Sequence, residues 1–115
     1  MPQDGLISNN GAKQLGLWIM PDNVSEGGLE TFLRGCVPES AKRLWSYTES
    51  HCLESRNFGA LYRDAHIHKA RMYSFLALQD EPGQSPGNAI SRKVLDPHSP
   101  MAVPFLKWCR QLYDI

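Results

Sequence analysis

The chain has 115 residues, of which 42% are hydrophobic and 21% charged, a composition typical of one globular domain with one core. Twelve Lys and Arg residues balance twelve Asp and Glu residues, so bulk charge does not favour binding to nucleic acid or acidic membranes. No apolar run reaches the roughly 18 residues of a membrane span, and the N-terminus lacks the features of a signal peptide. We therefore expect a cytoplasmic protein that does not contact membranes and forms a single domain over residues 1–115.

The N-terminal part contains the only strand that the pattern predicts with adequate length. Residues 1–14 are polar and rich in Gly and Asn, which predicts an irregular segment in which residues 6–7 add at most a short second strand. Residues 15–20 form a continuous apolar run that ends at a proline. Their length and their Trp and Ile content favour a buried central strand over a helix, and residues 21–23 then predict a turn.

The rest of the chain has helical periodicity. The segment 72–78 is apolar on nearly every side, which predicts the buried central helix of the core. The fold class that follows is α/β, predominantly helical, with one central strand. The expected helices are about four in number and cover residues 25–35, 40–53, 65–79 and a C-terminal stretch that begins at 100 or 104, with a short helical turn over 88–94.

A single apolar strand leaves its backbone groups without partners, because residues 6–7 are too short to complete a sheet. We therefore expect the edge of strand 15–20 to pair with a partner chain or with a second copy of this chain. The sequence has the pattern of part of a larger α/β fold.

Several uncommon motifs occur in a characteristic order along nearly the whole chain. By these motifs the chain resembles the C-terminal half of an uncharacterised family of bacterial and archaeal TOPRIM-like proteins. The motifs are residues 18–23 (WIMPDN), 28–33 (GLETFL), 68–70 (HKA), 75–83 (FLALQDEPG), 86–90 (PGNAI), 105–108 (FLKW) and 112–113 (LY).

The resemblance implies a metal-dependent phosphoryl-transfer or nucleic-acid-processing site, built on acidic residues at strand ends. This sequence departs from the family pattern because it lacks the upstream strands with their glutamate and Asp-x-Asp-type cluster. Phe75 also replaces a usual Trp. Activity of this chain alone is therefore not expected, and nucleic acid is a partner only by resemblance.

Two carboxylates are the best candidates for a metal site. Asp22 follows the predicted strand, where open α/β sheets place their ligands, and Glu30 lies one turn into the next predicted helix. Mg²⁺ takes oxygen ligands and often only one or two protein carboxylates. The alternative is structural: Asp22 would stabilise a turn, and Glu30 would favour the positive start of a helix.

A small basic cluster precedes the predicted central helix. Lys69 could neutralise a phosphate oxygen in a transition state, which makes it the candidate catalytic residue. His66 and His68 are two positions apart and point to different helix faces, so they form a poor chelate. The alternative is a solvated first helical turn.

The cysteines offer no further chemistry. Cys36, Cys52 and Cys109 have no Cys-x₂-Cys or His-x₃-His spacing that would indicate a zinc site, and nothing marks any of them as an activated nucleophile. We expect free buried thiols. No Gly-rich phosphate-binding loop is present in the sequence.

Overall fold

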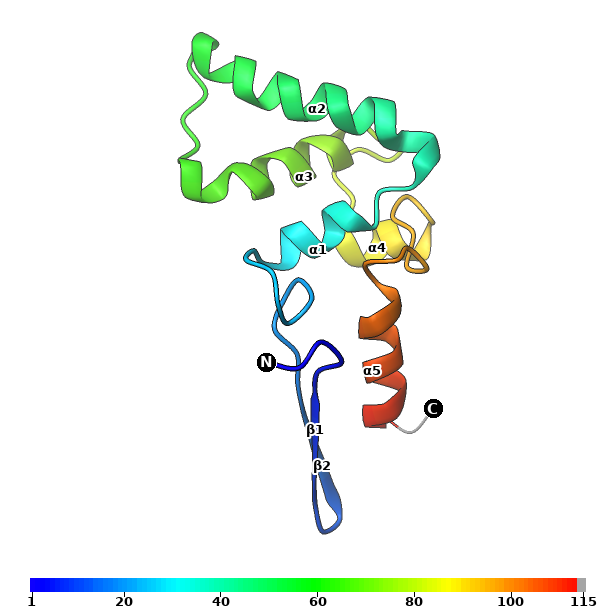
Figure 1. Cartoon of the computed structure of the whole chain (residues 1–115). Coiled ribbons are helices and arrows are strands. Elements are labelled where there is room, and N and C mark those ends of the chain that lie inside the picture. The colour runs from blue at the N-terminus through cyan, green and yellow to red at the C-terminus, as the bar shows by residue number, and fades with distance from the viewer. Residues whose placement is uncertain (114–115) are drawn as a thin grey trace. The chain divides into compact units, whose positions relative to one another are not determined.

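The computed structural model describes residues 1–113 and divides into two compact units. Unit 1 comprises Met1–Cys36 together with the residues from Pro97 onward, and unit 2 comprises Val37–Asp96. In the described residues there are five α-helices and a two-stranded antiparallel sheet (Figure 1). The predicted class, a small and predominantly helical α/β fold, is confirmed.

Unit 1 begins with a β-hairpin. Strand β1 (Leu6–Asn10) pairs with β2 (Lys13–Leu17), with Leu6 opposite Leu17 and Asn10 opposite Lys13. The two-residue turn begins at Gly11, whose φ of 66° is the left-handed value that a type II′ hairpin turn requires at this position. The hairpin is long and narrow in Figure 1.

This hairpin corrects two expectations. The second strand expected at most over 6–7 extends over Leu6–Asn10, so the segment 1–14 is irregular only in part, and the strand predicted over 15–20 ends at Leu17 and is exposed rather than central. The physical reason is the tight turn. Asn and Gly are typical of irregular segments, but here they close a hairpin whose polar residues remain in solvent and need no burial.

Helix α5 (Val103–Tyr113) packs against one face of this hairpin. A Cβ atom added to Gly16 would lie 2.6 Å from Cζ2 of Trp108, so the helix approaches the strand where a side chain is absent. The indole Nε1 of Trp108 donates a hydrogen bond of 3.1 Å to the Leu6 carbonyl. Of the two predicted starts of this helix, 100 and 104, the second is closer to the observed start at Val103. Pro104 is tolerated in the first turn because its missing N–H would have no intrahelical partner there.

The core of unit 1 is a cluster of aromatic rings. Helix α1 (Leu29–Gly35) contributes Phe32, whose ring centroid lies 5.2 Å from that of Phe105 on α5. Trp18, just after β2, lies 5.4 Å from the same Phe105 ring, and both pairs have edge-to-face geometry. Helix α1 begins later than the predicted residue 25, because a turn with Gly27 at a φ of 139° precedes it.

Unit 2 is built on two helices that lie side by side, α2 (Lys42–Ser55) and α3 (Ile67–Ala77) (Figure 1). Trp45 of α2 meets Phe75 of α3 edge to face at 5.4 Å. Short 3-10 turns flank these helices, and a third helix follows them. These elements are η1 (Glu39–Ala41), η2 (Arg56–Phe58), η3 (Asp64–His66) and α4 (Pro86–Ser91).

The predicted central helix is confirmed in position and only partly in burial. Met72, Phe75 and Leu76 are fully buried, as expected for the core. Tyr73 and Leu78 are about half exposed, at 49% and 51%, so the segment is not buried on every side. Helix α3 therefore presents one apolar stripe to the core, and its remaining apolar residues lie at the surface.

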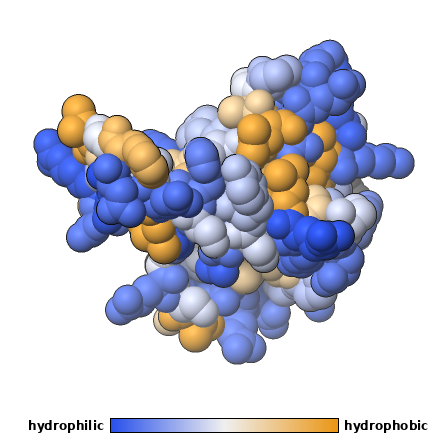
Figure 2. Space-filling model, turned by 90° about the horizontal axis from the view of Figure 1, so that it is seen from above, coloured by the Kyte–Doolittle hydropathy of each residue, from blue (hydrophilic) through white to orange (hydrophobic). Residues whose placement is uncertain are grey.

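None of the helices within residues 1–113 is both long enough and apolar enough to cross a bilayer. Apolar side chains nevertheless reach the surface in separate patches between hydrophilic ones (Figure 2). Two such groups, one on the hairpin and one between α2 and α3, are described below.

Candidate functional site

Asp22 lies in a turn between β2 and α1, and its carboxylate is committed to that turn. Oδ1 accepts hydrogen bonds from the backbone N–H groups of Ser25 (2.7 Å) and Val24 (3.1 Å), and Oδ2 accepts one from the Ser25 hydroxyl (2.9 Å). These bonds, with that from the Ser25 backbone first, hold the pKa of Asp22 below its ordinary value of 3.8. The carboxylate is therefore charged at neutral pH and stabilises the turn.

The next residue, Asn23, was not singled out by sequence reasoning. It is 6% exposed and adopts a φ of 70°, a left-handed conformation that Asn tolerates better than most residues. Its side-chain Oδ1 accepts a 2.7 Å bond from the Ile19 N–H, and its Nδ2 donates a 3.1 Å bond to the Gln3 carbonyl. Asn23 thus ties the N-terminal residues to the turn that holds Asp22.

Glu30 lies in the first turn of α1, nearer the helix start than the expected position one turn into the helix, and is partly exposed. That position suits the structural alternative, because acidic residues are favourable near the start of a helix. Beside it, the Thr31 hydroxyl accepts a 3.2 Å hydrogen bond from the Gly28 N–H. Within residues 1–113 no group of three or more His, Cys, Asp or Glu residues is placed to hold a metal ion.

The basic cluster belongs to the other unit. Lys69 is exposed in the first turn of α3, His68 is exposed beside it, and His66 ends the preceding turn η3. The two carboxylates lie in unit 1, so the sequence candidates are divided between the two compact units. Asp22 and Glu30 share unit 1, and Lys69 and the two histidines share unit 2.

The face of the hairpin that points away from α5 carries exposed leucines. We call this the outer face and define it by the alternate residues Leu6, Ser8 and Asn10 of β1 and Lys13, Leu15 and Leu17 of β2. Its three leucines are 46%, 68% and 51% exposed in chain order. Leu6 and Leu17 are directly opposite each other across the strands. One face of the hairpin therefore contacts a helix, while the three leucines of the other face are exposed.

A surface pocket of about 430 Å³ also lies in unit 1. Its walls are mainly apolar, and two carboxylates, Asp4 and Asp22, stand at it. We call it the acidic pocket, and its lining residues are Gln3, Asp4, Asp22, Val24, Pro100, Met101 and Pro104. Apolar walls with a few charged groups are typical of pockets that bind a ligand or a side chain.

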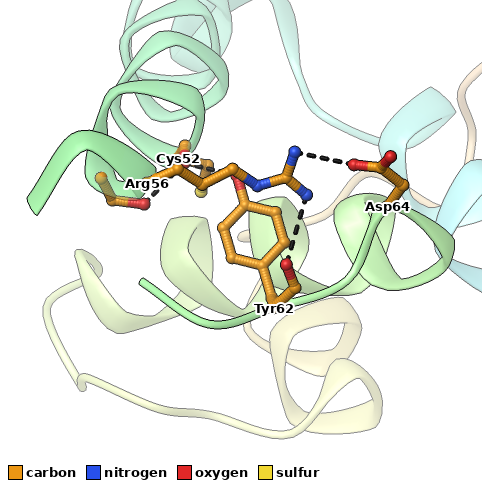
Figure 3. A network of polar contacts seen from close by, with 5 residues as sticks. Cys52, Arg56, Tyr62 and Asp64 are labelled. Atoms are coloured by element: carbon orange, nitrogen blue, oxygen red, sulfur yellow. Dashed lines mark hydrogen bonds and ion pairs between the residues drawn. The ribbon is translucent and has the colours of Figure 1, made fainter. Parts of the chain in front are cut away.

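In unit 2 the segment between α2 and α3 is held by a polar network (Figure 3). The Arg56 guanidinium lies 2.7 Å from a carboxylate oxygen of Asp64, donates to the Tyr62 carbonyl at 3.3 Å, and stacks 4.2 Å above the Tyr62 ring. The Tyr62 hydroxyl donates a short hydrogen bond to the Cys52 carbonyl. Arg56 in η2 therefore links Tyr62 and the start of η3 within the segment between α2 and α3.

Within residues 1–113 no disulfide links the three cysteines, and Cys36 and Cys52 are buried as expected. The Ser99 hydroxyl lies 3.6 Å from Cys36 Sγ, and Cys52 Sγ lies 3.3 Å from the Ser74 hydroxyl. Cys109 is partly exposed, and burial raises the pKa of its thiol, which keeps it protonated. None of these environments is that of an activated nucleophile.

Comparisons with curated proteins and with solved structures found no match. A family model described as "Protein of unknown function (DUF3226)" matches residues 1–114, which is nearly the whole chain. The chain belongs to this DUF3226 family of proteins of unknown function.

Proposed function

We propose that this chain is an interaction module that binds another polypeptide through the outer face and the open edges of its hairpin. One observation carries the proposal: the outer face exposes Leu6, Leu15 and Leu17 on a sheet whose other face is the one that contacts α5. Contiguous exposed apolar side chains on a soluble domain are typical of interaction surfaces.

The sheet geometry supports an extended partner. Within residues 1–113 the sheet has two strands, so in this part of the chain β1 and β2 each have a neighbour on one side and an open edge on the other. An added strand would pair with the backbone groups of such an edge, and its alternate side chains would extend the row of leucines. Two-stranded sheets are marginal by themselves, so an added strand would also stabilise the hairpin.

A metal-dependent nucleic-acid-processing role, which the TOPRIM-like resemblance implies, has weaker support from the geometry. Both oxygens of Asp22 already accept hydrogen bonds within a turn. Lys69 lies in a different compact unit from Asp22 and Glu30. The support for that role comes from the sequence motifs, whereas the support for the interaction role comes from contacts and exposed side chains in the structure.

The test compares two leucines with the same exposure. Leu17 on the outer face and Leu78 after α3 are each 51% exposed, so each can be changed to Lys at the same cost in exposed apolar surface. We expect Leu17→Lys to weaken association at least about tenfold, because a charge on the contact must be desolvated, and Leu78→Lys to leave it unchanged. Association is measured by sedimentation velocity of the chain, and by recovery of a copurifying chain with each variant.

Circular dichroism and tryptophan fluorescence establish that both variants are folded. Equal association of the two variants and the unchanged chain would contradict the proposal. So would a chain that remains monomeric, recovers no partner, and shows amide exchange at residues 13–17 that does not depend on concentration.

A further inference from the structure

The net charge of zero conceals a separation of charge along the chain. Residues 1–30 contain one Lys and four acidic residues, a net charge of −3. Residues 56–71 contain four Arg or Lys residues and one Asp, a net charge of +3, with two histidines in addition. The acidic segment belongs to unit 1 and the basic segment to unit 2.

The basic segment carries the most exposed large apolar side chains of the described residues. Phe58 is 83% exposed and Leu61 is 93% exposed, both in the connection between α2 and α3. We call residues 58–63 the docking loop. Arg63, at its end, is also exposed and is followed by the turn η3.

Polar contacts anchor the docking loop to the rest of unit 2 although its apolar side chains are in solvent. The network around Arg56 and Tyr62 anchors it on one side (Figure 3). On the other side the Ala60 N–H donates a 3.1 Å hydrogen bond to the Ser55 carbonyl at the end of α2. A loop that is ordered before binding loses little conformational entropy when it binds, so this anchoring favours a role in docking.

The acidic segment contributes to a pocket with matching properties. The acidic pocket has apolar walls, including Val24, Met101 and Pro104, and its two carboxylates are Asp4 and Asp22. Its volume of about 430 Å³ is within the range of pockets that enclose a small ligand, and so it can take apolar side chains. The hydrogen bonds that lower the pKa of Asp22 keep that carboxylate charged.

We propose that the docking loop of one copy of this chain binds in the acidic pocket of a second copy. Leu61 and Phe58 would contact the apolar walls, and Arg63 would lie beside Asp4 and Asp22. Complementary charge favours this occupant, since the loop and the pocket carry opposite net charges in the same chain. The two surfaces differ, so the contact is head-to-tail, and it uses none of the residues of the outer face.

The experiment is sedimentation velocity of the full chain over a range of concentrations, at low and at high ionic strength. We expect reversible association that weakens as salt rises, because screening reduces attraction between charges at the surface. Arg63→Glu and Asp4→Lys should each weaken association at least about fivefold, and combining them should restore most of it. Leu61→Ser, which leaves the charge unchanged, should also weaken it.

Arg43→Glu is the matched control, because Arg43 is an exposed cation of the same unit outside the docking loop. It should leave association unchanged. Three results would overturn the proposal: no association at low salt, no effect of Arg63→Glu, or a double variant that associates no better than the single ones. Association that Leu17→Lys abolishes and Arg63→Glu leaves intact would also overturn it, while supporting binding through the outer face.

Discussion

Asp22 and Asn23 are neighbours in one turn and have different roles. The sequence predicted the turn and both alternatives for Asp22, because Pro-Asp-Asn is a typical turn sequence. It did not predict that Asn23 would be buried, since its side chain bonds to Gln3, 20 residues earlier in the chain. Local sequence patterns cannot predict a contact over such a separation. They can predict an Asn with a left-handed backbone conformation in a turn.

Asn23→Ala should lower the free energy of unfolding by about 2–4 kcal/mol, from lost buried hydrogen bonds and from strain of Ala at a positive φ. Asn23→Gly separates the two causes, because Gly adopts this φ of 70° without strain but also loses the side-chain bonds. It should be about 1 kcal/mol more stable than the Ala variant. Denaturant unfolding measures both, and a loss below about 1 kcal/mol for Ala would contradict the role assigned to Asn23.

Asp22 should make stability depend on pH. Its pKa is lower in the folded chain than the ordinary value of 3.8, so folding favours the charged form. The resulting stabilisation is present above pH 4 and is lost as the pH falls through the folded pKa. Asp22→Asn should therefore show a smaller loss of stability than the unchanged chain between pH 5 and pH 2, measured by denaturant unfolding. An identical pH profile for both would contradict this.

At the scale of elements, apolar periodicity predicted the helices better than the strands. Positions 72, 75 and 76 have helical spacing, and their burial in α3 follows from it. The strand was misplaced because the run at residues 15–20 is apolar on both faces in sequence, yet the structure buries none of these residues and only brings one face of the strand against α5. The sequence argument assumes that apolar residues are buried, so it cannot predict a hairpin whose outer leucines are exposed.

The central position of α3 can be tested by a pair of leucines. Leu76 is fully buried and Leu78 is 51% exposed. Leu76→Ala should lower the free energy of unfolding by about 2–5 kcal/mol, because it removes buried methyl groups and leaves a cavity. Leu78→Ala should cost less than about 1 kcal/mol. Equal losses in denaturant unfolding would show that α3 does not form the core of unit 2.

The contact between α5 and the hairpin depends on a missing side chain. The Cβ of Gly16→Ala would lie 2.6 Å from the side chain of Trp108 and 2.8 Å from that of Leu112, so these side chains of α5 must shift. We expect a loss of about 1–3 kcal/mol and a changed tryptophan emission. Gly87→Ala is the control, because no atom lies within 4 Å of its added Cβ and it lies in helix α4. Its stability should be unchanged or slightly higher.

At the scale of the whole molecule, the sequence predicted candidate residues but not their grouping. Asp22, Glu30 and Lys69 each occupy the type of element expected, a turn or the start of a helix. Asp22 and Glu30 belong to unit 1 and Lys69 to unit 2. This division depends on contacts between segments that are distant in sequence, such as the N-terminal part and the residues from Pro97 onward, and local sequence patterns do not contain it. Net charge was equally uninformative, since zero is the sum of an acidic and a basic segment.

The last prediction concerns Mg²⁺, the candidate cofactor of the sequence analysis. A cation that binds only the folded chain raises its stability by about 2.7 kcal/mol at 100 times its dissociation constant. We expect no such rise at millimolar Mg²⁺ and no cleavage of DNA or RNA, because the Asp22 oxygens already accept three hydrogen bonds whose loss would open the turn. Thermal unfolding with and without Mg²⁺ measures the effect, with Ca²⁺ as a control for general ionic effects. A stabilisation that both Asp22→Asn and Glu30→Gln remove would instead establish a metal site on these two carboxylates, and would favour nucleic-acid processing over the interaction role.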